Sequence, residues 1–230
     1  MKSLLIDVWK RLTPWNRRAD VYANDTDNSY PERMDRLINN SVTAKSAAAI
    51  MVQYLLGKGY GEANDNLIVN REKNLKLIDF ADDVADDLVK QRGVFIHINW
   101  NALYQIADFS VIPYEWCRIG RKDSNDYAGK IAVCKEWLHP KRSDIQLIDV
   151  FNPRKSVIDA QVEKAGGWEH YKGQVLFINM DSKLIYPLSR IESVANDCDS
   201  EAQAAVYKNR LLRKGFYGNK IGRASCRERV

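Results

Sequence analysis

The order in which the hydrophobic period changes along the chain constrains the fold most. Residues 31–56 and 72–91 place apolar side chains three and four positions apart, as amphipathic helices do. From residue 94 to residue 151 the pattern changes to short alternating runs, which predict strands joined by hairpins. Because helices and strands are segregated rather than strictly alternating, we predict an α+β fold in which helices flank a mainly antiparallel sheet.

Capping and breaking residues set the predicted boundaries of the first two helices. Ser29 and Pro31 suit a helix start, and Gly57 ends that helix. Its predicted buried stripe comprises Met34, Leu37, Ile38, Val42, Ala49, Val52, Leu55 and Leu56. The second helix ends before Gly93, and its predicted buried face comprises Leu75, Ile78, Ala81, Ala85, Leu88 and Val89.

The remaining predicted elements follow in chain order. We expect strands over residues 94–100, 104–112, 115–121, 130–137 and 145–151. A helix over 153–165 and short strands over 175–179 and 184–186 come next. Two separate helices over 189–195 and 200–213, the second capped by Asp199, complete the predicted α+β region of residues 30–218.

The first 29 residues are predicted to form an N-terminal arm. They begin with a short amphipathic stretch that Pro14 ends, and residues 19–29 are polar and predict a loop. This segment contains five basic residues and a single acidic one, Asp7. The basic residues are Lys2, Lys10, Arg11, Arg17 and Arg18. A solvated arm explains this cluster, and Arg17 and Arg18 are also candidates for contacts with an acidic partner.

The last ten residues, 221–230, resemble one reading frame of a common short-read sequencing adapter, with every codon fitting. The alternative is a genuine basic tail that contacts an acidic partner. We treat the segment as a non-native tail and exclude it from fold reasoning. We therefore expect the natural protein to continue beyond Lys220, so that functions completed further on are not encoded here.

Charge and cysteine content exclude several classes of protein. The net charge is +5, of which three Arg and one Glu in the tail supply +2, and the remaining +3 is too small for a dedicated nucleic-acid binder. Scattered cysteines form neither a disulfide framework nor a CxxC metal pair, which favours folding in a reducing cytoplasm. No apolar run approaches the roughly 20 residues that span a bilayer, so we expect no membrane partner.

An acidic cluster occupies the second predicted helix. Asp79, Asp82, Asp83, Asp86 and Asp87 fall mostly outside its apolar face, and Asp82 is predicted to lie closest to that face. Such a cluster can hold a divalent metal, as in a metal-dependent phosphodiesterase. The sequence identifies no ligands on other elements, however. A solvated face, or a surface for a basic partner, is therefore favoured.

Other residues with catalytic potential lack the spacing that catalysis needs. His97, His139 and His170 lie on three different predicted elements, and no nucleophile motif accompanies them. Cys117 lies in a strand-like run, which favours burial over nucleophilic use. The glycine-rich segment 57–61 follows a helix rather than a strand, unlike a phosphate-binding loop. We predict no enzymatic activity, no cofactor and no metal.

Aromatic side chains gather in the predicted sheet region. Trp100, Trp116, Trp137, Tyr104 and Tyr114 can stack on nucleic-acid bases, but such residues more often fill a core or a subunit interface. We favour the interface. With a basic arm and an acidic helix in the same chain, the sequence then indicates a protein that assembles.

Several blocks in a fixed order give the chain a family resemblance over residues 28–218. The sequence resembles the portal proteins of tailed bacteriophages, in the version found in phages of Bacteroidetes-type gut hosts. No block is diagnostic alone, and the shared order carries the resemblance. The blocks are Tyr30–Ser46, Gly57–Tyr60, Asp79–Leu88 with Gly93–Ile98, Ile112–Arg118 (IPYEWCR), Val150–Pro153, Gly173–Ile178, Tyr186–Ser189 and Asp197–Phe216.

The resemblance implies a structural role in the virion. Portal proteins form a ring, usually dodecameric, at one capsid vertex, where DNA is packaged and ejected through a channel. The implied partners are other copies of the chain, the terminase motor, capsid and scaffold proteins, the tail connector, and double-stranded DNA contacted without sequence specificity. The chain would be made in the host bacterial cytoplasm.

The implied part of a portal is the wing-like region, truncated before or within the stem. Channel-lining residues then lie mostly beyond Lys220. The candidate contacts between subunits are Arg17, Arg18, Asp79, Asp82, Asp83, Asp86 and Asp87, which would supply faces of opposite charge. The alternatives are another virion structural or connector protein, or the metal-dependent phosphodiesterase that would use the Asp79–Asp87 helix.

Overall fold

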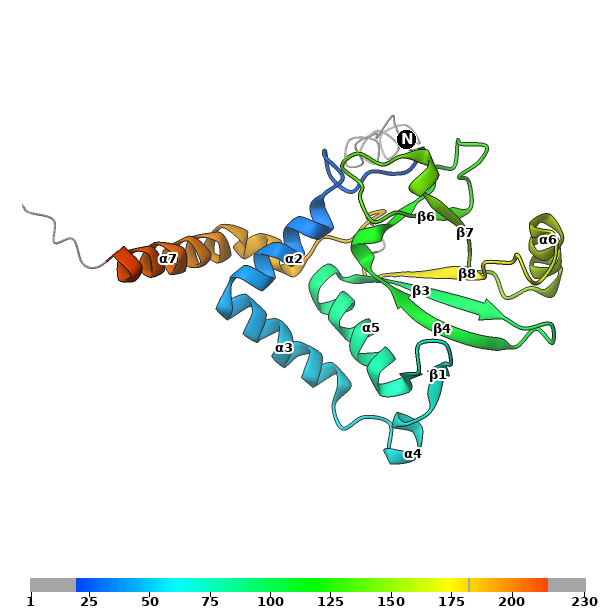
Figure 1. Ribbon diagram of the computed structural model, residues 1–230, viewed down its shortest axis with the longest axis horizontal. Helices are drawn as coiled ribbons and strands as arrows, with labels where there is room; N and C mark the ends of the chain where they lie inside the picture. Colours follow the sequence, from blue (N-terminus) through cyan, green and yellow to red (C-terminus); the bar gives the residue numbers. More distant parts are fainter. Residues whose placement is uncertain (1–19, 182, 215–230) are drawn as a thin grey trace, which may run out of the picture.

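A computed structural model describes residues 20–181 and 183–214 (Figure 1). It contains helices and a mixed sheet, so the predicted α+β class is confirmed. No helix in the described residues is long and apolar enough to cross a membrane. The elements are α2 (Tyr30–Asn40), α3 (Val42–Leu56), α4 (Glu62–Asp65), β1 (Ile68–Asn70), β2 (Leu75–Lys76), α5 (Leu77–Gln91), β3 (Gly93–Trp100), β4 (Ile106–Ile112), η1 (Tyr114–Trp116), β5 (Cys117–Ile119), β6 (Lys130–Val133), η2 (Arg142–Asp144), β7 (Gln146–Val150), α6 (Lys155–Ala165), β8 (Gln174–Asn179), η3 (Arg190–Val194) and α7 (Ala195–Lys214).

The main sheet of the described chain has six strands in the order β4-β3-β8-β7-β6-β5. Neighbouring strands are antiparallel except for β7 and β8, which pair in parallel through Asp149–Gln174 and Val150–Val175. Helix α6 provides the crossover that a parallel pair needs. In Figure 1 the helices α2, α3 and α5 lie at one end of the molecule, α6 lies at the other, and α7 projects outward.

Strand β3 separates two apolar clusters because alternate side chains of a strand point to opposite faces. On one face Val94, Ile96 and Ile98 pack against α5. On the other face Phe95 joins a cluster that comprises Tyr114, Cys117, Ile131, Ile148, Val175 and Tyr186. The burial predicted for Cys117 is confirmed, with 1% of the residue exposed.

The predicted helix over 31–56 is divided in two at Ser41. The Ser41 hydroxyl accepts a hydrogen bond from the Ala44 amide at 3.1 Å and donates one to Glu201 of α7. This N-cap starts a new helix, α3, and shifts the phase of its buried face. The buried stripe of α3 is Ala44, Ala48 and Val52, whereas the predicted stripe residues Val42, Ala49 and Leu55 are exposed.

Three further boundaries differ from the prediction. Helix α5 begins at Leu77 because Leu75 and Lys76 form β2, which pairs with β1. Residues 184–186 form bends rather than a strand. The two predicted C-terminal helices are instead a 3-10 turn, η3, that runs directly into α7. Asp199 is therefore not a cap, and its carboxylate accepts from Gln203 Nε2 at 2.6 Å.

Residues 20–29 are packed into the fold, although the sequence predicts them as part of an arm. Val21 is fully buried and bridges Gly120, where a side chain would lie 1.9 Å from the Tyr127 carbonyl oxygen. Asn28 accepts from buried Arg118, at 2.6 Å through its side chain and at 2.7 Å through its backbone. The polar composition that predicted a solvated loop instead supplies hydrogen bonds inside the fold.

Two of the aromatic residues assigned to an interface belong to the core. Trp137 and Tyr114 are 1% and 2% exposed. The Arg118 guanidinium lies 5.3 Å from the Trp137 ring centroid, and the Trp137 indole donates to the Trp116 carbonyl oxygen at 2.9 Å. Trp100 and Tyr104 are half-buried. The described fold thus uses much of the aromatic cluster to close its own sheet.

Candidate functional site

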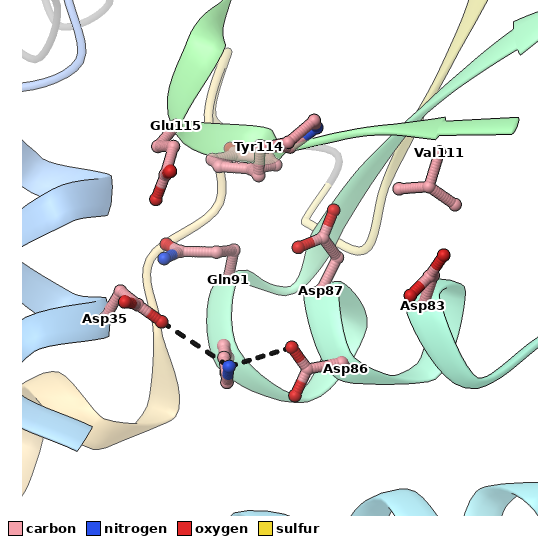
Figure 2. A pocket seen from close by; sticks show the side chains of 10 residues that line it. Asp35, Asp83, Asp86, Asp87, Gln91, Val111, Tyr114 and Glu115 are labelled. Carbon is pink, nitrogen blue, oxygen red and sulfur yellow. Dashed lines mark ion pairs between the residues drawn. The ribbon is translucent and has the colours of Figure 1, made fainter. Parts of the chain in front are cut away.

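An acidic pocket of about 330 Å³ lies where α2, α5 and η1 meet. Its volume is at the low end of the range for ligand sites, about 300–1,000 Å³. Figure 2 shows its lining side chains. They are Asp35 from α2, then Asp83, Asp86, Asp87, Lys90 and Gln91 from α5, Val111 from β4, and Pro113, Tyr114 and Glu115 around η1.

The turn of α5 explains how carboxylates reach this pocket. Val84 and Leu88 pack against the sheet, and consecutive residues of a helix are rotated by about 100°. Asp83 and Asp87 therefore lie beside the sheet-facing stripe rather than opposite it. In Figure 2 both side chains extend from α5 toward the strand that carries Val111.

Lys90 partly neutralises the pocket. Its ammonium lies 2.8 Å from Asp86 and 3.4 Å from Asp35, and Figure 2 marks both ion pairs. Burial lowers the pKa of Lys90, but the hydrogen bonds and attraction from Asp86 and Asp35 outweigh burial and raise it. Lys90 therefore remains charged and holds α2 against the end of α5.

Asp87 is the most perturbed carboxyl group of the pocket. Burial, followed by repulsion from Asp86, raises its pKa to about 8. Its Oδ2 atom has no hydrogen-bond partner among the described residues. Burial and the neighbouring aspartates also raise the pKa of Asp83, and burial and Asp35 raise that of Glu115. The pocket thus concentrates carboxyl groups whose charged forms are disfavoured by burial and by one another, and Lys90 pairs with only two of them.

Two buried uncharged groups of the pocket also have unused hydrogen-bonding atoms. Gln91 is 4% exposed and donates through Nε2 to the Pro31 carbonyl oxygen at 3.0 Å, but its Oε1 has no partner in the described chain. Tyr114 is 2% exposed, and its hydroxyl also lacks a described partner. In Figure 2 the Gln91 amide lies between Glu115 and Asp35. Buried polar atoms are normally paired, so these atoms are available to a ligand that enters the pocket.

The structure divides the predicted acidic cluster. Asp83, Asp86 and Asp87 line the pocket, and Asp79 and Asp82 do not. Asp79, Asp82 and Asp83 are exposed, whereas Asp86 and Asp87 are half-buried. The prediction that Asp82 lies closest to the buried face is wrong, because Asp87 is the most enclosed. No group of three or more His, Cys, Asp or Glu in the described residues is arranged to hold a metal ion. Arg17 and Arg18 lie outside the described residues.

Sequence reasoning missed several pocket residues. Asp35, Glu115 and Tyr114 come from elements distant from α5 in the sequence, so no local spacing connects them. Lys90 had a local signal, because Asp86 and Lys90 are four residues apart on one helix. Gln91 had a local signal as well, because it lies three residues after Leu88 and so continues the apolar stripe of α5 with a polar residue.

A second feature is an exposed apolar face on α3. Ala47, Ile50, Met51 and Tyr54 follow helical spacing on one side of the helix, away from its buried stripe. Ile50 is 65% exposed, Met51 47% and Tyr54 87%. In Figure 1 no other described element covers α3 on its side away from α5. Contiguous exposed apolar surface of this kind marks interaction sites.

The outer half of α7 is the third feature. Figure 1 shows it projecting from the rest of the chain, and all side chains from residue 203 to residue 213 are exposed. They include Val206 and Tyr207, which are 50% and 64% exposed, and Leu212, which is 69% exposed. An isolated helix is marginal in water, so its stability depends on contacts that the described chain does not supply.

The histidines do not converge on a site. His97 Nε2 lies 2.7 Å from the Lys172 carbonyl oxygen, and since a carbonyl only accepts, this nitrogen donates. His139 and His170 are exposed. Burial strongly raises the pKa of the Cys117 thiol, which keeps it protonated. His97 and Cys117 are thus held in the fold, and neither lies beside the other histidines in a common site.

Comparison with known proteins gives a likeness in fold. No protein-family model and no curated protein matches the sequence. Among solved structures, a chain in the virion of a native gene transfer agent particle matches with a TM-score of 0.55 and 7% identity, covering 81% of this chain and 46% of that one. A chain in the neck of a native gene transfer agent particle, a neck computed with C12 symmetry, matches with a TM-score of 0.55 and 9% identity, covering 80% of this chain and 46% of that one. The chain thus spans less than half of the length of these neighbours and shares their fold.

Proposed function

We propose that this chain is the N-terminal part of a virion structural protein of a phage-like particle, and more specifically of its ring-forming portal protein. One observation carries the proposal. Over 80% of its length the chain shares the fold of a chain in a gene transfer agent neck that was computed with C12 symmetry. The order of sequence blocks that resembles phage portals supports the finer assignment. The role proposed is structural rather than enzymatic.

The exposed surfaces of the chain suit a subunit that is completed by neighbours. A closed ring is built from heterologous contacts, in which one face of a subunit meets a different face of the next. The apolar face of α3 and the projecting half of α7 are two such faces. Their burial between subunits would supply the hydrophobic stabilisation that the isolated chain lacks.

Charged residues would set the register of this contact. Of the candidate contacts, this proposal keeps Arg17 and Arg18 on one subunit and Asp83, Asp86 and Asp87 on the next, because Asp79 and Asp82 lie outside the pocket. Opposite charges at an interface select partners and orientation more than they add affinity. The small net charge also fits a DNA channel, because tight phosphate binding would stop the DNA from moving. Terminase, capsid, scaffold and tail-connector proteins would bind the same ring.

The oligomeric state of the full-length protein tests the proposal. We expect native mass spectrometry and negative-stain electron microscopy to detect closed rings, with twelve subunits as the expected number. A protein that stays monomeric at micromolar concentration, with or without scaffold protein, would contradict a portal role.

The position of the protein in the particle separates a portal from the runner-up, another connector of the neck. The fold neighbours belong to a virion and to a neck, so both positions are compatible with the likeness. Antibody labelling of particles opened at the vertex should place a portal within the capsid shell. Labelling only between the shell and the tail would favour a connector.

A further inference from the structure

We propose that the acidic pocket binds an arginine or lysine side chain from the basic N-terminal segment, residues 1–19, of an adjacent copy of this chain. This inference rests on the proposed ring and assigns one specific contact in it. The pocket is the receptor and the segment supplies the ligand.

The chemistry of the pocket selects a cation. Within the described chain it is lined by carboxylates from three elements, Asp35, Asp83, Asp86, Asp87 and Glu115, and by a single lysine. Lys90 already lies between Asp86 and Asp35, so neither Asp83 nor Asp87 has an ion pair in the described chain, and both repel the other carboxylates when they ionise. A second cation would offset repulsion that burial makes costly.

The unpaired atoms of the pocket point to the same ligand. Asp87 Oδ2 and Gln91 Oε1 are buried acceptors without donors in the described chain, and the Tyr114 hydroxyl also accepts. An ammonium has three N–H donors, and a guanidinium has five in a fixed plane. A ligand with several donors and no acceptor therefore satisfies atoms that the fold leaves unpaired. An apolar group would leave all of them unpaired, and an anion would leave Gln91 Oε1 without a donor.

The sequence offers a matching ligand. Residues 1–19 carry Lys2, Lys10, Arg11, Arg17 and Arg18 against Asp7, and the described chain begins directly after them at Asp20. The pocket and this segment are oppositely charged parts of one chain. A pairing between different surfaces of successive copies is the heterologous contact from which a ring closes.

Peptide binding tests the pocket independently of ring formation. The receptor is the full chain with Lys2, Lys10, Arg11, Arg17 and Arg18 changed to Gln, so that its own segment does not compete. The probe is a fluorescein-labelled peptide of residues 1–19, followed by anisotropy at low salt and pH 8.5, where Asp87 is largely ionised. We expect saturable binding, and none by the same peptide with all five basic residues replaced by Gln.

Matched variants decide whether the pocket is the receptor. Asp83→Asn with Asp87→Asn should weaken binding at least about tenfold, because both carboxylates line the pocket and Asp87 is enclosed in it. Asp79→Asn with Asp82→Asn removes the same charge from exposed positions of the same helix, and should change binding less than about twofold. Circular dichroism checks that each variant is folded. Equal losses for the two pairs would show general attraction to an acidic surface, and would overturn the pocket assignment.

Isotope mixing decides which copy supplies the segment. A carbodiimide joins a lysine to a contacting carboxylate, and the assembled full chain is prepared from equal parts of ¹⁴N and ¹⁵N protein. We expect cross-linked peptides between Lys2 or Lys10 and Asp83 or Asp86 that combine both isotopes. Pairs of one isotope only would place each segment in its own pocket and overturn the assignment to a neighbour. With Arg11, Arg17 and Arg18 also changed to Lys, every basic residue of the segment can react. Intact rings without any such cross-link would then refute the inference and leave the proposed function standing.

Discussion

Arg118 and Asp87 are both ionisable groups withdrawn from water, but their surroundings differ. The Arg118 guanidinium donates to both oxygens of Asn28 and to the carbonyl oxygens of Glu115 and Cys117, at 2.6–2.8 Å. Asp87 has an oxygen with no partner in the described chain. The fold therefore pairs the polar atoms of one buried ionisable group and leaves an oxygen of the other for a partner. We interpret the first as part of the folded core and the second as part of an assembly surface.

The largest expected effect comes from breaking the satisfied site. Arg118→Met removes a donor from four acceptor oxygens, of which Asn28 Oδ1 keeps the hydrogen bond from the Asn24 amide, and it removes the contact with Trp137. We expect the free energy of unfolding, measured with urea, to fall by about 3–5 kcal/mol. The control Arg142→Met removes an exposed ion pair with Asp126 and should cost less than about 0.5 kcal/mol. Similar losses for both variants would remove the basis of the comparison.

A second variant tests the same closed region through one hydroxyl. The Tyr186 hydroxyl accepts from the Ile119 amide at 2.7 Å and donates to the Tyr22 carbonyl oxygen at 2.9 Å. Tyr186→Phe should lower the free energy of unfolding by about 2 kcal/mol, because it leaves both groups unpaired. Tyr207→Phe changes an exposed residue of α7 and is expected to leave stability unaltered. Thermal unfolding of the two variants side by side gives the difference.

Asp87→Asn should have the opposite sign. Because the pKa of Asp87 is raised to about 8, the folded chain retains a proton that the unfolded chain releases above about pH 4. The stability of the native protein should therefore fall as the pH rises from about 4 to 8. Asparagine cannot ionise, so at pH 8.5 we expect the free energy of unfolding of the variant to exceed that of the native protein by roughly 1–2 kcal/mol. Urea titrations at pH 5 and pH 8.5 measure the effect.

The exposed Asp82→Asn variant is the control for that prediction. It removes a carboxylate from the same helix, and it should not flatten the pH dependence. An Asp87→Asn protein that is less stable than the native protein at pH 8.5 would mean that Asp87 already has a partner in the fold.

Substitutions on the exposed face of α3 should have the smallest effect on stability, but they should prevent assembly. Ile50 and Tyr54 are exposed on α3, and changing both to Ser should alter the unfolding free energy by less than about 1 kcal/mol. Mass photometry of the full-length protein should then detect subunits instead of rings. Gln53→Ser, at an exposed polar position of the same helix, should leave assembly intact. Rings that persist in the double variant would exclude the α3 face from the interface.

Local pattern was sufficient to predict the α+β class and most elements of the described chain. It failed where a tertiary contact decides the outcome. Ser41 divides the first helix because Glu201, far along the sequence, accepts from its hydroxyl. Residues 184–186 contain a buried tyrosine whose hydroxyl pairs with two backbone groups, so they resemble a strand without pairing as one.

The candidate site was harder to predict than the fold. The predicted buried face of α5 left out Phe80 and Val84, which both pack on the sheet. Without these two residues the predicted buried face was centred on the wrong side of the helix. Asp82 was therefore predicted to lie nearest to that face, whereas Asp87 is the most enclosed aspartate in the structure. Asp35 and Glu115 join the pocket through packing between distant elements, which no spacing in the sequence encodes.

A cryo-electron microscopy map of the assembled full-length protein tests the central claim most directly. We predict a closed ring in which a neighbouring copy covers the α3 face around Ile50 and Tyr54 and supplies density for a cationic side chain beside Asp87. The buried network of Arg118 should be the same in every subunit and should contact no neighbour. A ring in which the α3 face and the acidic pocket both remain open to solvent would contradict the account.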